Sequence, residues 1–344
     1  MNLIGILDPF IFVCPEINSN KNEINSYFRN ILDWYDLKEQ KWMQVSLSEN
    51  APELLAQNND YPLSQKLNNL IHENQLEYVS PDVIMRIMNS IFKDENCLEK
   101  YISENSIADY QIEKFHFTSN ISRPNEYLLH LQQLIGIHAV LKFIVQPSIN
   151  SILITKHIPT PVSRINFSGS IQYLKDDDSG NLQEKVIEVG QISMVDNVEA
   201  FCNEIKPVNV WIIGNRIEAF KKAVETESIN YFIAKGQSLS TIKLNEFSFG
   251  RKFYDSCMPI GFLNEPTKVG KLIKALCDLV VEDKNRKYHE FRVHKGPTAR
   301  QEMRGDWKAF RMDIDHEFHL QFWKLEKRLE FSNVEHHGVF RIYK

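Results

Sequence analysis

The spacing of hydrophobic and polar residues predicts a chain that mixes helices with strands. Apolar residues recur at helical intervals over 22–36, 62–73, 81–93, 124–145, 217–227 and 268–282. Short and mostly apolar runs predict buried strands at 3–13 (interrupted at Asp8-Pro9), 151–155, 208–213 and 231–234. Ser80 followed by Pro81 is typical of a capped helix start. His138, on the apolar face of the longest helix, is interpreted as a core histidine.

Two alternating runs, 170–174 and 185–189, flank the sequence Asp176-Asp177-Asp178-Ser179-Gly180-Asn181. Alternation on both sides of a polar, glycine-containing turn predicts a β-hairpin with a solvated acidic tip. A calcium loop is not favoured, because the ligand spacing that such a loop requires does not follow.

The C-terminal quarter has a different pattern. A helix expected over 268–282 precedes β-like runs at 289–294, 309–314, 317–325, 329–334 and 339–343, joined by short connections. Short connections favour an antiparallel meander packed on the helix. The fold class predicted is α+β, with a helix-rich region 1–160, a mixed α/β region 161–267 and a helix plus antiparallel sheet over 268–344.

Composition restricts the class of protein. The chain has 344 residues, 43% of them hydrophobic, enough for two or three domains with a real core. Five widely spaced cysteines form no CxxC pair, and the apolar N-terminus lacks a basic segment, so we expect a cytoplasmic protein with reduced thiols. No uninterrupted apolar stretch is long enough to predict a membrane span, and no glycine-rich nucleotide loop is present.

Charge is distributed unevenly. The net charge of −5 argues against a protein that coats nucleic acid along its whole surface. Residues 284–344, however, hold 14 Lys and Arg against 9 Asp and Glu, a net of +5, whereas residues 1–283 carry a net of −10. Six of the 11 histidines also fall in the last segment: His289, His294, His316, His319, His336 and His337. Candidate chemistry therefore concentrates in the C-terminal segment.

One string in that segment carries a recognisable pattern. It runs Met303-Arg304-Gly305-Asp306-Trp307-Lys308-Ala309-Phe310-Arg311-Met312-Asp313-Ile314, then Phe318-His319-Leu320, and later Glu335-His336-His337 with Tyr343 near the end. This arrangement, after the 268–282 helix, resembles the RelE/ParE toxin superfamily, which includes RelE and HigB. The resemblance covers about 268–344.

The resemblance implies a metal-free endoribonuclease that promotes attack of the 2′-OH on the adjacent phosphate. It assigns catalytic roles to Arg311, His319, His337 and Tyr343. Arg311 matches a basic residue on the central strand, His337 closes the next strand, and His319 stands where arginine is usual. Asp313 stands where a second basic residue is common, which is a departure from the pattern. An arginine can bind phosphate, and a histidine can transfer a proton near neutral pH.

Further residues of the same string are candidates for binding substrate. These are Arg304, Lys308, Trp307 and His336, while Trp307, Phe318 and Tyr343 are aromatic residues suited to stacking on a base. No cofactor or metal is expected. The partners implied are RNA or the ribosome, together with a protein partner such as an antitoxin, in a prokaryotic defence or growth-arrest system.

Several alternatives stay open at this stage. A RelE-like fold could bind a partner protein or a ribosome without cleavage. His319, His336 and His337 could instead hold a metal ion. The acidic region before 268 could mask the basic segment. Lastly, Asp8 at the end of a hydrophobic strand is a feature of PIN-like nucleases, in which acidic residues gather around magnesium; its candidate companions are Glu16, Asp82 and Asp109.

Overall fold

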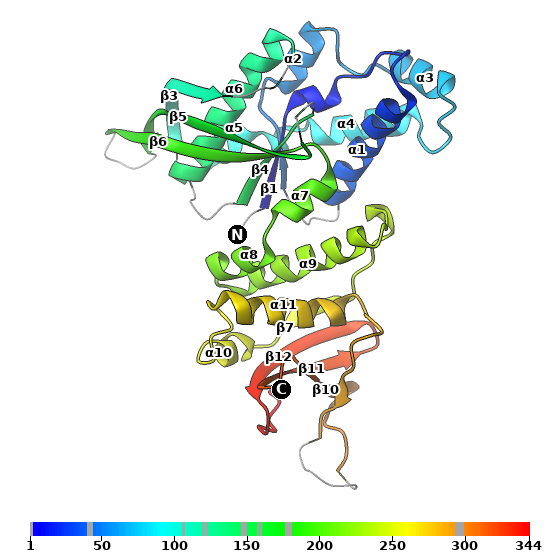
Figure 1. The fold of residues 1–344 in the computed structure, drawn as a ribbon, viewed down its shortest axis with the longest axis vertical. Coiled ribbons are helices and arrows are strands. Elements are labelled where there is room, and N and C mark those ends of the chain that lie inside the picture. The colour runs from blue at the N-terminus through cyan, green and yellow to red at the C-terminus, as the bar shows by residue number, and fades with distance from the viewer. Residues whose placement is uncertain are drawn as a thin grey trace. The chain divides into compact units, whose positions relative to one another are not determined.

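The computed structural model describes residues 3–39, 44–104, 107–118, 121, 123–145, 150–156, 158, 160–175, 181–292 and 299–344. The chain forms two compact units, Asn2–Glu204 and Ile205–Lys344, each with its own sheet and helices (Figure 1). The combination of helices and mixed sheets confirms the predicted α+β class.

The N-terminal unit is built on a mixed sheet, which has six strands in the described residues. Their order is β2 (Gln44–Ser46), β1 (Leu3–Leu7), β4 (Asn150–Ile154), β6 (Leu182–Val195), β5 (Val162–Lys175) and β3 (Ile107–Thr118). The first four pair in parallel, and β5 and β3 pair antiparallel with their neighbours. The β5–β6 pair is the predicted hairpin, whose acidic tip at 176–180 lies outside the described residues.

Helices flank this sheet. They are α1 (Lys21–Glu39), α2 (Ala51–Gln57), α3 (Ser64–Glu73), α4 (Pro81–Ile91), α5 (Leu98–Glu104), α6 (Asn125–Val140) and α7 (Val198–Glu204). The helices predicted at 22–36, 62–73 and 81–93 are thus confirmed. Ser80 caps α4, since its hydroxyl accepts a hydrogen bond from the Val83 amide at 3.4 Å.

Helix α6 belongs to the core of the N-terminal unit and continues into a π-helical turn, Leu141–Val145. Residues Asn125–Val145 are long and apolar enough to cross a membrane, yet 56% of the most apolar window is buried inside the fold, as in a core helix of a soluble protein. His138 is 1% exposed and hydrogen-bonds Ser151. Burial lowers its pKa to about 3, so it is a neutral core histidine, as predicted.

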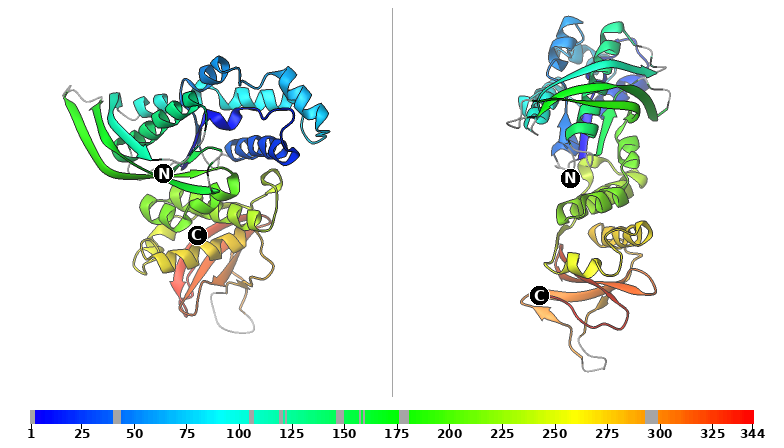
Figure 2. Two further views of the ribbon diagram at one scale, coloured as in Figure 1. Left: turned by 45° about the horizontal axis from the view of Figure 1, so that its top comes forward. Right: turned by 90° about the vertical axis from the view of Figure 1, so that its left-hand side faces the viewer.

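The C-terminal unit combines helices with a second sheet. Its helices are α8 (Pro207–Gly214), α9 (Ile217–Ala234), α10 (Phe253–Cys257) and α11 (Pro266–Val280). Its strands are β7 (Glu246–Phe249), β8 (His289–Glu290), β9 (Met303–Arg304), β10 (Trp307–Asp313), β11 (Phe318–Leu325) and β12 (Arg328–His336). Figure 2 shows α11 between the α8–α9 pair and this sheet. The helix predicted at 268–282 is therefore confirmed.

The second sheet has the order β7-β12-β11-β10-β8, with β9 paired to β10. Strands β10, β11 and β12 form the predicted antiparallel meander. Strand β7, which precedes residue 268, adds to β12 in parallel, so the sheet is mixed rather than purely antiparallel. Of the run expected at 289–294, β8 covers His289–Glu290, and residues 293 and 294 lie outside the described residues.

Three predicted strands are wrong. The runs at 208–213 and 231–234 are helical, in α8 and at the end of α9. A short apolar run does not distinguish a buried strand from a buried helix by periodicity. Pro207 in the first turn and Asn215 in a left-handed conformation delimit α8 as a helix. The run at 339–343 is an irregular segment that packs on the sheet instead of joining it.

Gly338 redirects the chain into this last segment. Its φ of +97° is a conformation that favours glycine, and it lies two residues after the end of β12. Carbonyls of the segment then accept side-chain hydrogen bonds from the sheet: Val339 from Gln321, Arg341 from Asn333, and Tyr343 from Trp323. The segment 339–343 therefore covers part of one sheet face.

Candidate functional site

The turn between β10 and β11 sets the position of two candidate residues. Asp315 accepts hydrogen bonds from the amides of Glu317 and Phe318 at 2.9 and 3.1 Å, which closes the turn. In the resulting register Asp313 lies directly opposite His319. The turn therefore brings a carboxylate beside a histidine at one end of the sheet.

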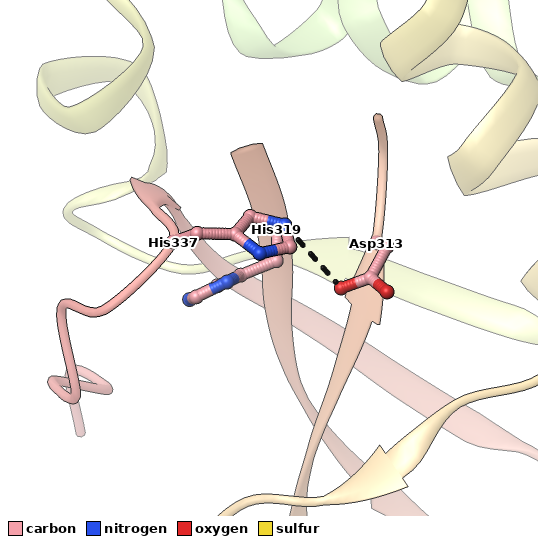
Figure 3. Close-up of side chains that lie close together, drawn as sticks. All are labelled: Asp313, His319 and His337. Carbon is pink, nitrogen blue, oxygen red and sulfur yellow. Dashed lines mark ion pairs between the residues drawn. The ribbon is translucent and has the colours of Figure 1, made fainter. Parts of the chain in front are cut away.

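His337 joins this pair from the end of β12. Its amide donates to the Glu317 carbonyl at 2.9 Å, which holds the residue near the β10–β11 turn. Its Nε2 lies 3.5 Å from Oδ1 of Asp313, and its ring centroid lies 5.1 Å from that of His319. Figure 3 shows the three side chains converging from three segments. We call Asp313, His319 and His337 the His–Asp cluster.

The members of the His–Asp cluster differ in exposure. His319 is only 2% exposed, whereas the side chains of His337 and Asp313 are 42% and 61% exposed. Burial is the main cause that lowers the pKa of His319, and the nearby charges of His337 and Arg311 lower it further. The cluster thus has one fixed, neutral imidazole and two side chains that reach solvent.

Hydrogen bonds determine which ring nitrogen of His319 carries the proton. Asn333 Nδ2 donates to Oε1 of Gln321 at 2.9 Å, so the Gln321 amide nitrogen faces Nε2 of His319, at 3.1 Å. An amide nitrogen only donates, so Nε2 accepts and the ring proton lies on Nδ1. Gln321 and Asn333 are fully buried on the same sheet face. They act as positioning residues that the sequence did not reveal as part of the site.

Arg311 supplies a cation beside the cluster. It lies opposite Gln321 on β10, and its guanidinium lies 5.6 Å from the centroid of the Phe340 ring. In the described part of the chain Arg311 forms no ion pair with a carboxylate, so its charge is available for a ligand. The structure therefore brings together three of the four predicted catalytic residues, namely Arg311, His319 and His337.

Tyr343, the fourth predicted catalytic residue, lies elsewhere. Its backbone carbonyl accepts from Trp323 at 2.8 Å and from Ser332 at 2.9 Å, while its ring lies under the guanidinium of Arg341. These contacts anchor the end of segment 339–343. None of the interactions found for Tyr343 in the described residues joins it to the His–Asp cluster.

The predicted binding residues are also dispersed. Arg304 forms a bidentate pair with Glu330, at 2.8 and 2.7 Å, and lies over Trp307. His336 contacts Glu317 at 3.7 Å and packs on Phe318. Lys308 is exposed, opposite Lys324. Among these binding candidates, Lys308 is the cation without a carboxylate partner in the described residues.

The acidic residues considered for a PIN-like site do not assemble. The Asp8 carboxylate is fully buried and is neutralised by Arg123 at 2.5 Å, with a further hydrogen bond from Thr155. Glu16, Asp82 and Asp109 are exposed on separate elements. In the described part of the chain, the His–Asp cluster is the group of potential metal ligands whose donor atoms lie close enough together to share one ion.

A second polar feature lies beside Asp8, at the carboxyl ends of the parallel strands. Lys156, which follows β4, donates to the Val13 carbonyl at 2.9 Å, and burial lowers its pKa to about 8. A cavity of about 190 Å³ opens beside it, lined partly by Tyr27, Trp34 and Asp196. Ligands often bind at this edge of open α/β sheets, but the lining shows no specific chemistry.

Comparison with known proteins gives no relative for this chain. No protein-family model, no curated protein and no solved structure matches it. The functional conclusion therefore rests on the geometry of the His–Asp cluster.

Proposed function

We propose that this protein is an RNA-targeting toxin or effector whose C-terminal unit cleaves RNA without a metal ion. The observation that carries the proposal is the Asp313–His337 pair, at 3.5 Å, with Arg311 on the same strand as Asp313 and without a carboxylate partner in the described residues. The order of helix α11 followed by the β10–β12 meander is the order that the RelE/ParE resemblance implies. The net charge of +5 over 284–344 supports an RNA ligand.

The proposed reaction begins at the 2′-OH of RNA. Nε2 of His337 faces Asp313, so its proton is directed at the carboxylate and Nδ1 is left as the basic nitrogen. His337 takes the 2′ proton through Nδ1, the 2′ oxygen attacks the adjacent phosphorus, and the bond to the 5′ oxygen breaks. Asp313 stabilises the imidazolium that forms, and Arg311 binds the phosphate as its charge increases.

His319 has a supporting role in this scheme. It is buried and neutral, and its ring packs beside the ring of His337. We therefore assign it to positioning the His337 ring rather than to proton transfer. The products are a 2′,3′-cyclic phosphate and a free 5′-OH, and the protonated His337 or water supplies the proton for the 5′ oxygen.

The biological setting follows from the resemblance. We propose a cytoplasmic protein of a prokaryotic defence or growth-arrest system, with RNA or the ribosome as target and a protein partner as regulator.

A second function is favoured by two observations. Arg304, a predicted substrate ligand, is fully paired with Glu330, and segment 339–343 covers part of the polar sheet face. A RelE-like unit that binds a partner protein or a ribosome without cleavage would tolerate both features. The cleavage assay below separates the two functions.

The test uses the full chain with a labelled single-stranded RNA, in the presence of a chelator. We expect cleavage with 2′,3′-cyclic phosphate ends, a loss of about 100-fold or more in His337→Ala, and a loss of at least 10-fold in Arg311→Ala. His316→Ala, at an exposed histidine of the neighbouring β10–β11 turn, is the matched control and should keep its rate within about 3-fold. Absence of cleavage by the wild-type chain, or equal losses in both histidine variants, would refute the nuclease.

A further inference from the structure

The His–Asp cluster has the donor set of a transition-metal site. Two imidazoles and one carboxylate are the protein ligands of many zinc sites that keep an open position and of non-haem iron sites. Here they come from the end of β10, from β11 and from the residue after β12 (Figure 3). We propose that this cluster binds a divalent transition metal of the zinc class, and that the bound metal switches off the proposed ribonuclease site.

The distances are compatible with a shared ion. One donor atom from each of the three residues lies within 4.8 Å of the others. In a tetrahedral site with bonds of about 2.0 to 2.1 Å, neighbouring donors are about 3.3 Å apart. The separation of 3.5 Å between His337 Nε2 and Asp313 Oδ1 is close to this value. The side chains of His337 and Asp313 are partly exposed, so small rotations can bring their donor atoms to the distances that coordination requires.

The surroundings of His319 also suit a metal ligand. The ring is 2% exposed, and its Nε2 faces the buried Gln321 amide at 3.1 Å, so the position of the imidazole is fixed before a metal binds. Where the metal takes Nε2, the Gln321 amide keeps the Val339 carbonyl as its partner, at 3.4 Å. The His319 imidazole is therefore oriented before a metal binds. The exposed side of the cluster leaves room for water as the fourth ligand.

The positive charge of Arg311 should weaken metal binding at the His–Asp cluster, so Arg311→Ala distinguishes this site from other histidine sites. Arg311 lies two residues before Asp313 on β10, opposite Gln321 on the same sheet face, so its charge repels a cation held by the cluster. Removing this charge should tighten metal binding, whereas removing a ligand should weaken it. Generic binding by surface histidines would not give opposite changes in these two variants.

The regulatory part of the inference rests on the proposed function. A metal held by Nε2 of His337 and by Asp313 replaces the contact through which Asp313 orients the imidazole and stabilises its protonated form, and the charge of the metal disfavours protonation of Nδ1. Metal binding and catalysis therefore exclude each other. Zinc should inhibit cleavage over the concentration range in which it binds, and a chelator should restore the activity.

The test is a titration of the chelator-treated full chain with ZnCl₂, followed by calorimetry, and with CoCl₂, followed by the visible absorption of tetrahedral Co(II). We expect one site per chain, weakened at least 30-fold in His337→Ala and in Asp313→Asn, tightened about 3-fold or more in Arg311→Ala, and unchanged in His316→Ala. Asp313→Asn and His337→Ala alter exposed residues, so both variants should fold.

The outcomes separate the two proposals. Equal affinities in His337→Ala and His316→Ala, or absence of binding by the wild type, would overturn the metal site. Selective binding in a chain that never cleaves RNA would support the metal site and refute the nuclease. Cleavage that does not change on zinc saturation would overturn the switch.

Discussion

Asp313 and His319 face each other across β10 and β11 in a register that the Asp315 turn fixes. This single cross-strand pair gives the C-terminal unit its candidate chemistry, because His337 then completes the group from the end of β12. Asp313, which departs from the pattern of the proposed RelE/ParE resemblance, thereby has a defined place in the structure. In the proposed reaction it orients the histidine that takes the proton.

Arg304 should contribute to stability rather than to substrate binding. Its bidentate pair with Glu330 is largely buried, with side chains 28% and 23% exposed. Arg304→Ala should lower the free energy of unfolding by about 1 to 2 kcal/mol, because Glu330 loses a charged partner. Lys308→Ala, on the same β-hairpin, should change it by less than about 0.5 kcal/mol. Denaturant unfolding measures both; unchanged stability with weakened RNA binding in Arg304→Ala would restore the original assignment.

The Asp8–Arg123 pair should be essential to the N-terminal unit. Both side chains are fully buried, so Asp8→Asn leaves an arginine without a charged partner and should cost about 3 to 5 kcal/mol. The double variant Asp8→Leu with Arg123→Met should recover most of this loss. Hydrogen exchange at the β1 amides reports on this unit. If magnesium ions slowed hydrogen exchange at the β1 amides of the wild type and not of Asp8→Asn, Asp8 would be part of a magnesium site instead.

His138 should make the N-terminal unit sensitive to acid. Its pKa is lowered by burial from 6.5 to about 3, so the unfolded chain binds a proton between these values and the folded chain does not. Its contribution to stability is therefore complete above about pH 6.5 and is lost as the pH falls toward 3.

Between pH 7 and pH 5 this loss should be about 2 kcal/mol. The replacement His138→Gln keeps a polar group near Ser151 and removes the titration, so its stability should fall less steeply over the same range. Parallel pH profiles of wild type and His138→Gln would contradict the assignment.

The sequence indicated much of the fold where periodicity was long and regular. Helices α4 and α11 have several turns of regular apolar spacing, and the strands of the β10–β12 meander are separated by short polar turns. Helix α8 was mistaken for a strand because VNVWII is too short and too uniformly apolar to show a period. The segment 339–343 has β-like residues, but its carbonyls bond to side chains instead of a neighbouring strand.

The site was predictable only in part. The concentration of histidines and the RelE-like string pointed to Arg311, His319 and His337. The partnership of Asp313 with His337 depends on strand register and on the position of the residue after β12, and neither can be obtained from composition. Gln321 and Asn333 look like ordinary strand residues in sequence. Their role depends on burial beneath segment 339–343.

The central claim is that Asp313 and His337 act as one unit in RNA cleavage. The most direct test is a double-mutant cycle on the full chain, measuring the RNA cleavage rate of Asp313→Asn, His337→Ala and the double variant in chelator. We expect a loss of about 10- to 100-fold for Asp313→Asn, a larger loss for His337→Ala, and no further loss in the double variant. Losses that multiply in the double variant, or full activity in Asp313→Asn, would contradict the account.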